Sequence, residues 1–182
     1  PESKKQYLMF TARCHPGESN GSVLLYGLID YFLSPNPESE FFRNNFIIKI
    51  VPMINIDGVV EGFYRICLCG DDLNRMWVTP DPALHPTVFH TKELLRRYKP
   101  AVYIDFHGHS RMNGTFAFAC PNNNENHDRE KILPKIISYT SSYFSYEKCV
   151  FSIPPKRQTA SRCVAYLEMG IIQSFTIETS FC

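Results

Sequence analysis

The sequence predicts an α/β fold in which a mixed, mostly parallel central sheet carries helices on both faces. Three observations predict it: short apolar runs typical of strands, longer segments with apolar residues at helical spacing, and the alternation of the two along the chain. The 182 residues, of which 44% are hydrophobic and 14% aromatic, are enough to form one compact core. We therefore expect a single domain over residues 1–182.

The chain begins with a strand and a helix. Residues 6–13 (QYLMFTAR) form an apolar run that stops at the turn-like sequence of residues 15–18. Asn20 or Ser22 is suited to cap the helix that follows, whose apolar positions continue at helical spacing to Leu33. The Pro-Asn-Pro segment directly after it ends the helix.

A second strand and a long irregular segment follow. Residues 46–53 (FIIKIVPM) predict the strand, and residues 55–58 (NIDG) predict a turn after it. The stretch of residues 61–86 is rich in charge, Gly and Pro, so we expect it to be irregular. Long irregular segments inside compact domains commonly carry function.

The second half of the chain alternates in the same way. Strand patterns occupy residues 101–106, 115–119 and 171–178. Helical patterns occupy residues 87–98 and 128–143. Pro134 lies in the second helical pattern and requires a kink or a later start there.

Composition excludes several classes of partner. The 19 Lys and Arg and 18 Asp and Glu leave a net charge of +1, which provides no electrostatic footprint for nucleic acid or an anionic membrane. No apolar run approaches the ~18–20 residues of a membrane helix. The seven cysteines are odd in number and irregularly spaced, which favours a reduced, intracellular protein without a disulfide framework.

Side chains that can bind metal or transfer protons lie at the ends of three predicted strands. His15 and Glu18 follow the first strand, His107 follows the strand of residues 101–106, and Glu178 ends the last one. In open α/β sheets, ligands bind beyond the carboxyl ends of the strands. We therefore expect these four side chains at one edge of the sheet.

Their types and spacing fit a catalytic zinc site. His15-x-x-Glu18 places an imidazole and a carboxylate on a tight turn, and His107 would complete a set of two histidines and a glutamate. Three protein ligands leave a fourth position for water, whose pKa zinc lowers towards ~7. An isolated HxxE pattern or strand-end histidine is more commonly incidental, so the hypothesis depends on their joint placement.

The irregular segment contains a possible carboxylate-binding sequence at residues 71–75 (DDLNR). Asn and Arg are suited to this task, because the guanidinium group offers a planar fork of donors. Without a metal site nearby, a solvated charged loop would be the simpler interpretation, and the same holds for Arg65.

Six motifs occur in the order found in one enzyme family. They are HPGE at residues 15–18, NIDGVV at 55–60, YR at 64–65, DLNR at 72–75, DFHGHS at 105–110 and FTIE at 175–178. With them the chain resembles the zinc metallocarboxypeptidases, specifically the cytosolic carboxypeptidase branch of tubulin deglutamylase-like enzymes, over about residues 7–181. The stretch at residues 80–86 (PDPALHP) is similar to that of short-form members.

The resemblance implies roles for the residues around the metal. The zinc ligands fall on His15, Glu18 and His107, with one Zn²⁺ per chain. Glu178 matches the general base that activates the water. Asp72 matches a carboxylate that orients His15, and such partners fix the tautomer of a ligand histidine.

The resemblance also implies how a peptide would be held. Asn74 and Arg75 match the pair that binds the free C-terminal carboxylate, and Arg65 matches the arginine that polarises the scissile carbonyl. Arg162 falls near the floor of the specificity pocket, where this branch carries a cation for acidic side chains. The usual Asn-Pro-Asp-Gly and Gly-Thr-Ala/Gly-Arg stretches are here NIDG and, at residues 159–162, TASR.

The implied function is hydrolysis of C-terminal amino acids, glutamate above all, from acidic protein tails such as polyglutamylated tubulin. The implied location is the cytoplasm, at the cytoskeleton or cilium, with no nucleic-acid or membrane partner. Family members continue beyond the equivalent of Cys182 and carry an N-terminal β-sandwich. We therefore expect a zinc carboxypeptidase catalytic domain that is a truncated version of the fold and a fragment of a longer chain.

Two other functions remain open. Zinc deacylases of N-acyl amino acids, similar to aspartoacylase, share the HxxE, Asn-Arg and distal His arrangement. A non-catalytic module that binds zinc or a protein tail is the second alternative. The HPGE and HGHS motifs favour the peptidase, and the presence of Glu178 counts against the non-catalytic module.

Overall fold

A computed structural model describes residues 5–121 and 128–181, which contain a six-stranded sheet. The strands are β1 (Gln6–Ala12), β2 (Phe46–Val51), β3 (Val102–His109), β4 (Thr115–Ala119), β5 (Val150–Phe151) and β6 (Ser174–Ser180). They are ordered β2-β1-β3-β6-β4-β5. The first four in this order run parallel, β4 is antiparallel to β6, and β5 is parallel to β4. The prediction of a mixed, mostly parallel sheet is confirmed.

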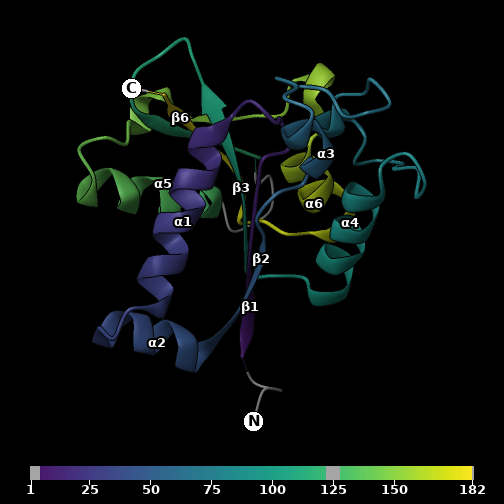
Figure 1. The fold of residues 1–182 in the computed structure, drawn as a ribbon. Helices are drawn as coiled ribbons and strands as arrows, with labels where there is room; N and C mark the ends of the chain where they lie inside the picture. The colour runs from purple at the N-terminus through teal and green to yellow at the C-terminus, as the bar shows by residue number, and fades with distance from the viewer. Residues whose placement is uncertain (1–4, 122–127, 182) are drawn as a thin grey trace.

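Helices cover both faces of this sheet, as predicted. They are α1 (Ser19–Leu33), α2 (Pro37–Asn45), α3 (Ile56–Val60), α4 (Pro86–Tyr98), α5 (Arg129–Thr140) and α6 (Ser161–Met169). Helices α1, α2 and α5 lie on one face, and α3, α4 and α6 lie on the other (Figure 1). In the described part of the chain, none of the helices has the length and apolar character needed to cross a membrane.

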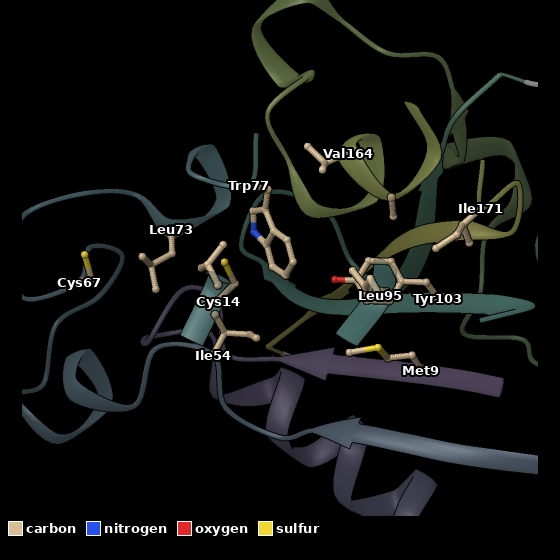
Figure 2. Packing of buried hydrophobic residues seen from close by; sticks show 12 residues of the cluster. Met9, Cys14, Ile54, Cys67, Leu73, Trp77, Leu95, Tyr103, Val164 and Ile171 are labelled. Atoms are coloured by element: carbon tan, nitrogen blue, oxygen red, sulfur yellow. The ribbon is translucent and has the colours of Figure 1, made fainter. Parts of the chain in front are cut away.

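Each face of the sheet has its own hydrophobic core, because consecutive residues of a strand point to opposite sides. Towards α1, the sheet contributes Leu8 and Phe10 of β1, which pack with Leu25 of α1. Towards α4 and α6, Met9 of β1 belongs to a second cluster (Figure 2). Its other large members are Trp77, Tyr103, Leu95 and Val164.

The first helix begins earlier than predicted. Helix α1 starts at Ser19 with Glu18 in the N-cap position, so neither Asn20 nor Ser22 caps it. The Asn20 side chain instead donates to the backbone oxygen of Thr179 at 2.7 Å. This contact ties α1 to β6.

Three other elements differ in detail from the prediction. The predicted turn at residues 55–58 is the start of the short helix α3. Strand β3 continues to His109 because the whole of β6 pairs with it, and the last pair joins His109 to Ser180. Helix α5 starts at Arg129 and contains Pro134 in its interior.

The sequence patterns do not predict α2 and α6. A signal for α2 was present: Asn36 accepts from the Ser39 N–H at 2.7 Å as N-cap, and Pro37 is the first helical residue. Helix α6 has no such signal, since its first five residues are all buried and no amphipathic pattern marks them.

Candidate active site

Two histidines and a glutamate meet at the carboxyl ends of β1 and β3. His15 Nδ1 lies 2.7 Å from Glu18 Oε1, and His107 Nδ1 lies 2.9 Å from Glu18 Oε2. The two Nδ1 atoms are 3.2 Å apart. All three side chains are buried, and their donor atoms lie within 4.8 Å of one another. One metal ion could therefore contact all three.

The turn after β1 brings His15 and Glu18 together. Gly17 donates its N–H to the Tyr64 backbone oxygen at 2.8 Å, and a Cβ at Gly17 would lie 2.9 Å from that same oxygen. Only glycine therefore fits this position without a shift. The Gly108 N–H donates to Glu18 Oε2 at 2.8 Å, which fixes the carboxylate beside β3.

The Nε2 atom of each histidine lies within hydrogen-bond distance of a carboxylate. His15 Nε2 lies 3.1 Å from Asp72 Oδ1, and His107 Nε2 lies 2.8 Å from Asp105 Oδ2. Asp105 is fully buried, and its Oδ2 also accepts from the Ser161 hydroxyl at 2.7 Å. Metal-binding histidines commonly have this arrangement, because the carboxylate fixes the orientation and tautomer of the ring.

The carboxylates of this cluster are held in the ionised form. Burial acts to raise the pKa of Glu18, but hydrogen bonds from His107 and His15 outweigh it and keep that pKa well below its usual range. Burial also acts to raise the pKa of Asp72, but the hydrogen bond with His15 outweighs it and lowers that pKa. At Asp105, the charge of His107 outweighs burial and lowers the pKa in the same way. The ionised carboxylate is the form that binds a metal ion.

Glu178 lies on the strand next to this cluster. Because β6 pairs in parallel with β3, Glu178 is the register partner of His107. Burial raises the pKa of Glu178 above its ordinary value. A carboxylate with a raised pKa beside a metal cluster is suited to accept a proton and return it.

A cleft of about 820 Å³ lies over the cluster, within the ~300–1,000 Å³ typical of ligand sites. Most of the predicted site residues line it: His15, Glu18, Arg65, Asn74, His107, Arg162 and Glu178. Asp72 and Arg75 are not among its lining residues. The structure therefore brings seven of the nine predicted site residues to one cavity.

The Arg65 and Arg75 guanidinium groups gather around Asp72. Arg65 donates to Asp72 Oδ2 from Nε at 3.1 Å and from Nη2 at 2.7 Å. Arg75 is not among the residues that line the cleft, and its Nη1 donates to the Asn74 backbone oxygen at 2.7 Å. The Asn74 side chain is positioned by the Ser161 N–H, which donates to its Oδ1 at 3.1 Å. Asn74 is thus the member of the Asn-Arg pair that faces the cleft.

Arg162 contributes a buried positive charge to the cleft. The side chain is 4% exposed, and its guanidinium carbon lies 5.2 Å from the centre of the Phe118 ring. Within residues 5–121 and 128–181, no acidic side chain forms an ion pair with it, and its Nε has no hydrogen-bond partner. The hydroxyl of Thr176, another cleft residue, is buried without a partner in the same range. Buried polar groups are normally paired, so these two are suited to a ligand.

The sequence predicts no role for two residues that support the site, Asp105 and Ser161. A signal for Asp105 was present, because residues two apart in a strand face the same side and Asp-x-His therefore places a carboxylate beside His107. Ser161 offered no such signal. It contacts Asn74 and Asp105 only because α6 packs across the sheet.

Known proteins resemble this chain in both sequence and fold. The family model described as Peptidase_M14, zinc carboxypeptidase, matches residues 1–80. Cytosolic carboxypeptidase 1 of Gallus gallus is 37% identical over 98% of this chain and 16% of its own length. Cytosolic carboxypeptidase 2 of Macaca fascicularis is 38% identical over 97% of this chain and 22% of its own length.

The fold matches a crystal structure of a metallo-carboxypeptidase from Burkholderia cenocepacia, with a TM-score of 0.88 and 24% sequence identity. The match covers 100% of this chain and 50% of that structure. The chain therefore spans half of that structure, and 16% and 22% of the two curated relatives. The crystal structure shows the shared fold, and the sequence relatives show that the chain belongs to the zinc carboxypeptidase family, with cytosolic carboxypeptidases among its relatives.

Proposed function

We propose that this chain forms the core of a zinc-dependent carboxypeptidase that removes C-terminal residues, glutamate above all, from acidic protein tails. The observation that carries the proposal is the meeting of His15, Glu18 and His107 with Glu178 in one cleft. The family and the cytosolic carboxypeptidase relatives support the same class of reaction.

The donor set fits a catalytic zinc ion. Two imidazole nitrogens and a carboxylate are zinc ligands, and a set of three leaves a position for water or substrate. Asp72 and Asp105 on the outer ring nitrogens are the partners that such ligands require. When bound here, zinc would lower the pKa of a water molecule and polarise the scissile carbonyl.

The residues of the chain itself bind the peptide and move the proton. Asn74 binds the terminal carboxylate from the cleft wall, and Arg75 joins it by turning away from Asp72. This anchoring presents the last peptide bond to the cluster. Arg65 stabilises the negative charge that develops on the carbonyl oxygen. Glu178 takes a proton from the attacking water and returns it to the leaving amine nitrogen.

Arg162 supports a preference for an acidic departing residue. Its guanidinium is buried in the cleft and has no acidic partner among the described residues. A glutamate side chain would supply that partner through charge-assisted hydrogen bonds, which are stronger than neutral ones. Leucine at the same position would leave the cation buried and unpaired, which costs free energy.

Protein tails that end in glutamate are the substrates that such a site would accept, and polyglutamylated tubulin is one of them. The relatives are named cytosolic carboxypeptidases, which supports a cytoplasmic location. Tubulin as the substrate would place the protein at the cytoskeleton or the cilium.

Peptide hydrolysis by the full-length protein tests the reaction class. The zinc-loaded protein should release glutamate from a peptide that ends in glutamate, and a chelator should stop the release until zinc is added back. The same peptide with an amidated C-terminus should resist, because it offers no carboxylate to Asn74. Hydrolysis of an N-acyl amino acid but not of the peptide would favour the deacylase instead.

Substitution of a metal ligand tests the zinc site. His107→Ala should lower the zinc content by about one ion per chain and abolish hydrolysis, because two ligands bind zinc far more weakly than three. Metal analysis after dialysis measures the loss. His90→Ala, which removes an exposed histidine of α4, is the matched control and should change neither quantity. A His107→Ala protein with its full zinc content would contradict the assignment.

Asp105→Asn tests the carboxylate behind His107. The amide keeps the size of the side chain but loses the charge that orients and polarises the imidazole, so zinc affinity should fall about 10–100-fold. Competition with a chromogenic chelator measures the dissociation constant. Asp57→Asn, at an exposed carboxylate of α3, should leave it unchanged. An unchanged affinity in folded Asp105→Asn protein would show that Asp105 does not support the metal.

A further inference from the structure

A second group of metal-binding side chains lies in the irregular segment between α3 and α4. This group, here called the thiol cluster, consists of Cys67, Cys69, Asp71 and His85, none of which lines the cleft. Cys67 and His85 are buried, and Cys69 is exposed. In the described part of the chain, the two cysteines and His85 are one of two groups whose donor atoms all lie within 4.8 Å.

The donor atoms of the thiol cluster form a continuous series of contacts. Cys67 Sγ lies 3.1 Å from Cys69 Sγ, and Cys69 Sγ lies 3.4 Å from Asp71 Oδ2. The same carboxylate oxygen lies 2.9 Å from His85 Nε2. The Asp81 N–H donates to His85 Nδ1 at 3.2 Å, which turns Nε2 towards the cluster.

The backbone already holds both thiols on one side of a tight turn. The Cys67 N–H donates to the Asp71 backbone oxygen at 2.9 Å, and the Gly70 N–H donates to the Cys67 oxygen at 3.0 Å. Gly70 has a φ of 88°, a conformation that favours glycine. The turn therefore brings the cysteines and Asp71 close together without the help of an ion.

We propose that the thiol cluster binds a second zinc ion, with both thiolates and the His85 imidazole as ligands and the Asp71 carboxylate beside them. Cysteine and histidine are zinc ligands, and a set of three leaves one position of the tetrahedron for Asp71 or a water molecule. Thiolates select zinc over magnesium and calcium, which prefer oxygen ligands. The family resemblance implies one zinc per chain, and this site adds another that lies outside the cleft.

The donor atoms of Cys67, Cys69 and His85 lie within 4.8 Å of one another, so small movements would let one ion contact all three. Two sulfur ligands on a tetrahedral zinc lie about 3.8 Å apart, so the Cys67–Cys69 pair has to open by about 0.7 Å. A neutral His85 that binds the ion through Nε2 carries its proton on Nδ1, so the Asp81 N–H gives up its contact with Nδ1 when the ion binds. The exposed side of Cys69 provides its path from solvent.

A zinc ion at this place would support the cleft by joining the two ends of the segment. The turn that carries Cys67 and Asp71 directly precedes Asp72 and Asn74, which contact the two ligand histidines. His85 is the N-cap residue of α4. Binding would therefore fix the segment of Asp72 and Asn74 against α4.

Cobalt substitution in the full-length protein tests the proposal. Thiolate ligands give cobalt(II) a charge-transfer absorption band in the near ultraviolet, which histidine and glutamate ligands do not give. The His15–Glu18–His107 site contains no sulfur, so the band reports the thiol cluster. Metal-free, reduced protein should bind about two cobalt ions per chain, and the band should accompany one of them. Replacing both cysteines, Cys67→Ser with Cys69→Ser, should abolish the band and about one equivalent of metal.

Two control variants separate this site from other thiols and from the cleft. Cys149→Ser removes a half-buried thiol outside the cluster and should keep the band. His107→Ala should lose the other equivalent of cobalt and keep the band, so failure of this proposal and failure of the catalytic zinc site are distinguishable. If the double cysteine variant does not fold, alkylation of the unmodified protein replaces it, since bound zinc should protect Cys69 from iodoacetamide.

Three results would overturn the proposal. One is the absence of a charge-transfer band in the unmodified protein. Another is an unchanged metal content when both cysteines of the cluster are replaced. The third is alkylation of Cys69 at the same rate with and without zinc.

Discussion

Replacing Glu178 with glutamine in the full-length protein should lower kcat for a glutamate-ended peptide about 10²–10⁴-fold, the usual contribution of a general base. The amide has the size of the carboxylate but cannot accept the proton of the attacking water. Glu178 is not one of the three proposed metal ligands, so zinc content should stay that of the parent. KM should change little, because the substrate is held by other side chains.

Two measurements decide the role of Glu178. Metal analysis shows that the loss of turnover is not a loss of zinc, and the rate of glutamate release gives kcat. Glu61→Gln changes an exposed glutamate outside the cleft and should leave both unchanged. Turnover within a factor of a few of the parent would show that Glu178 is not the base.

Replacing Arg162 with alanine should reduce kcat/KM for glutamate-ended peptides far more than for leucine-ended ones. Arg162 is 4% exposed, so its guanidinium would meet the glutamate carboxylate in a largely dehydrated site. Truncating one partner of such a buried charge pair costs ~2–5 kcal/mol. At ~1.4 kcal/mol per decade, this corresponds to roughly 30-fold to several-thousand-fold in kcat/KM for the glutamate-ended peptide.

Two other arginines serve as comparisons for this specificity experiment. Arg157 also lines the cleft but is exposed, so Arg157→Ala should have a much smaller effect on either peptide. Arg75→Ala should damage both peptides similarly, because every substrate presents a terminal carboxylate. Thermal unfolding checks that α6 tolerates loss of Arg162. If Arg162→Ala lowers kcat/KM equally for the two peptides, Arg162 does not cause the acidic preference. Another cation, such as Arg157 or Lys156, would then have to cause it.

Local sequence patterns were sufficient to locate the strands that carry the site. The apolar runs of β1, β3 and β6 end near His15, His107 and Glu178, and parallel pairing of these strands places their carboxyl ends at one edge. The strand ends were less well predicted, because pairing with a neighbour extends β3 beyond its apolar run. Helices α2 and α6 were missed, since short helices show little periodicity.

The sequence by itself determines the order and chemical type of the proposed metal ligands. It also determines the family and the strands of the sheet, because motifs and strand patterns depend on residues close in the chain. Only the tertiary structure decides which cations face the cleft. It places Arg162 in the cleft wall through α6 and leaves Arg75 beside Asp72, outside the residues that line the cleft. It also brings His85 to the two cysteines of the thiol cluster, 16 residues beyond Cys69. Such contacts join segments that no local pattern relates, because packing against a common sheet determines their distance.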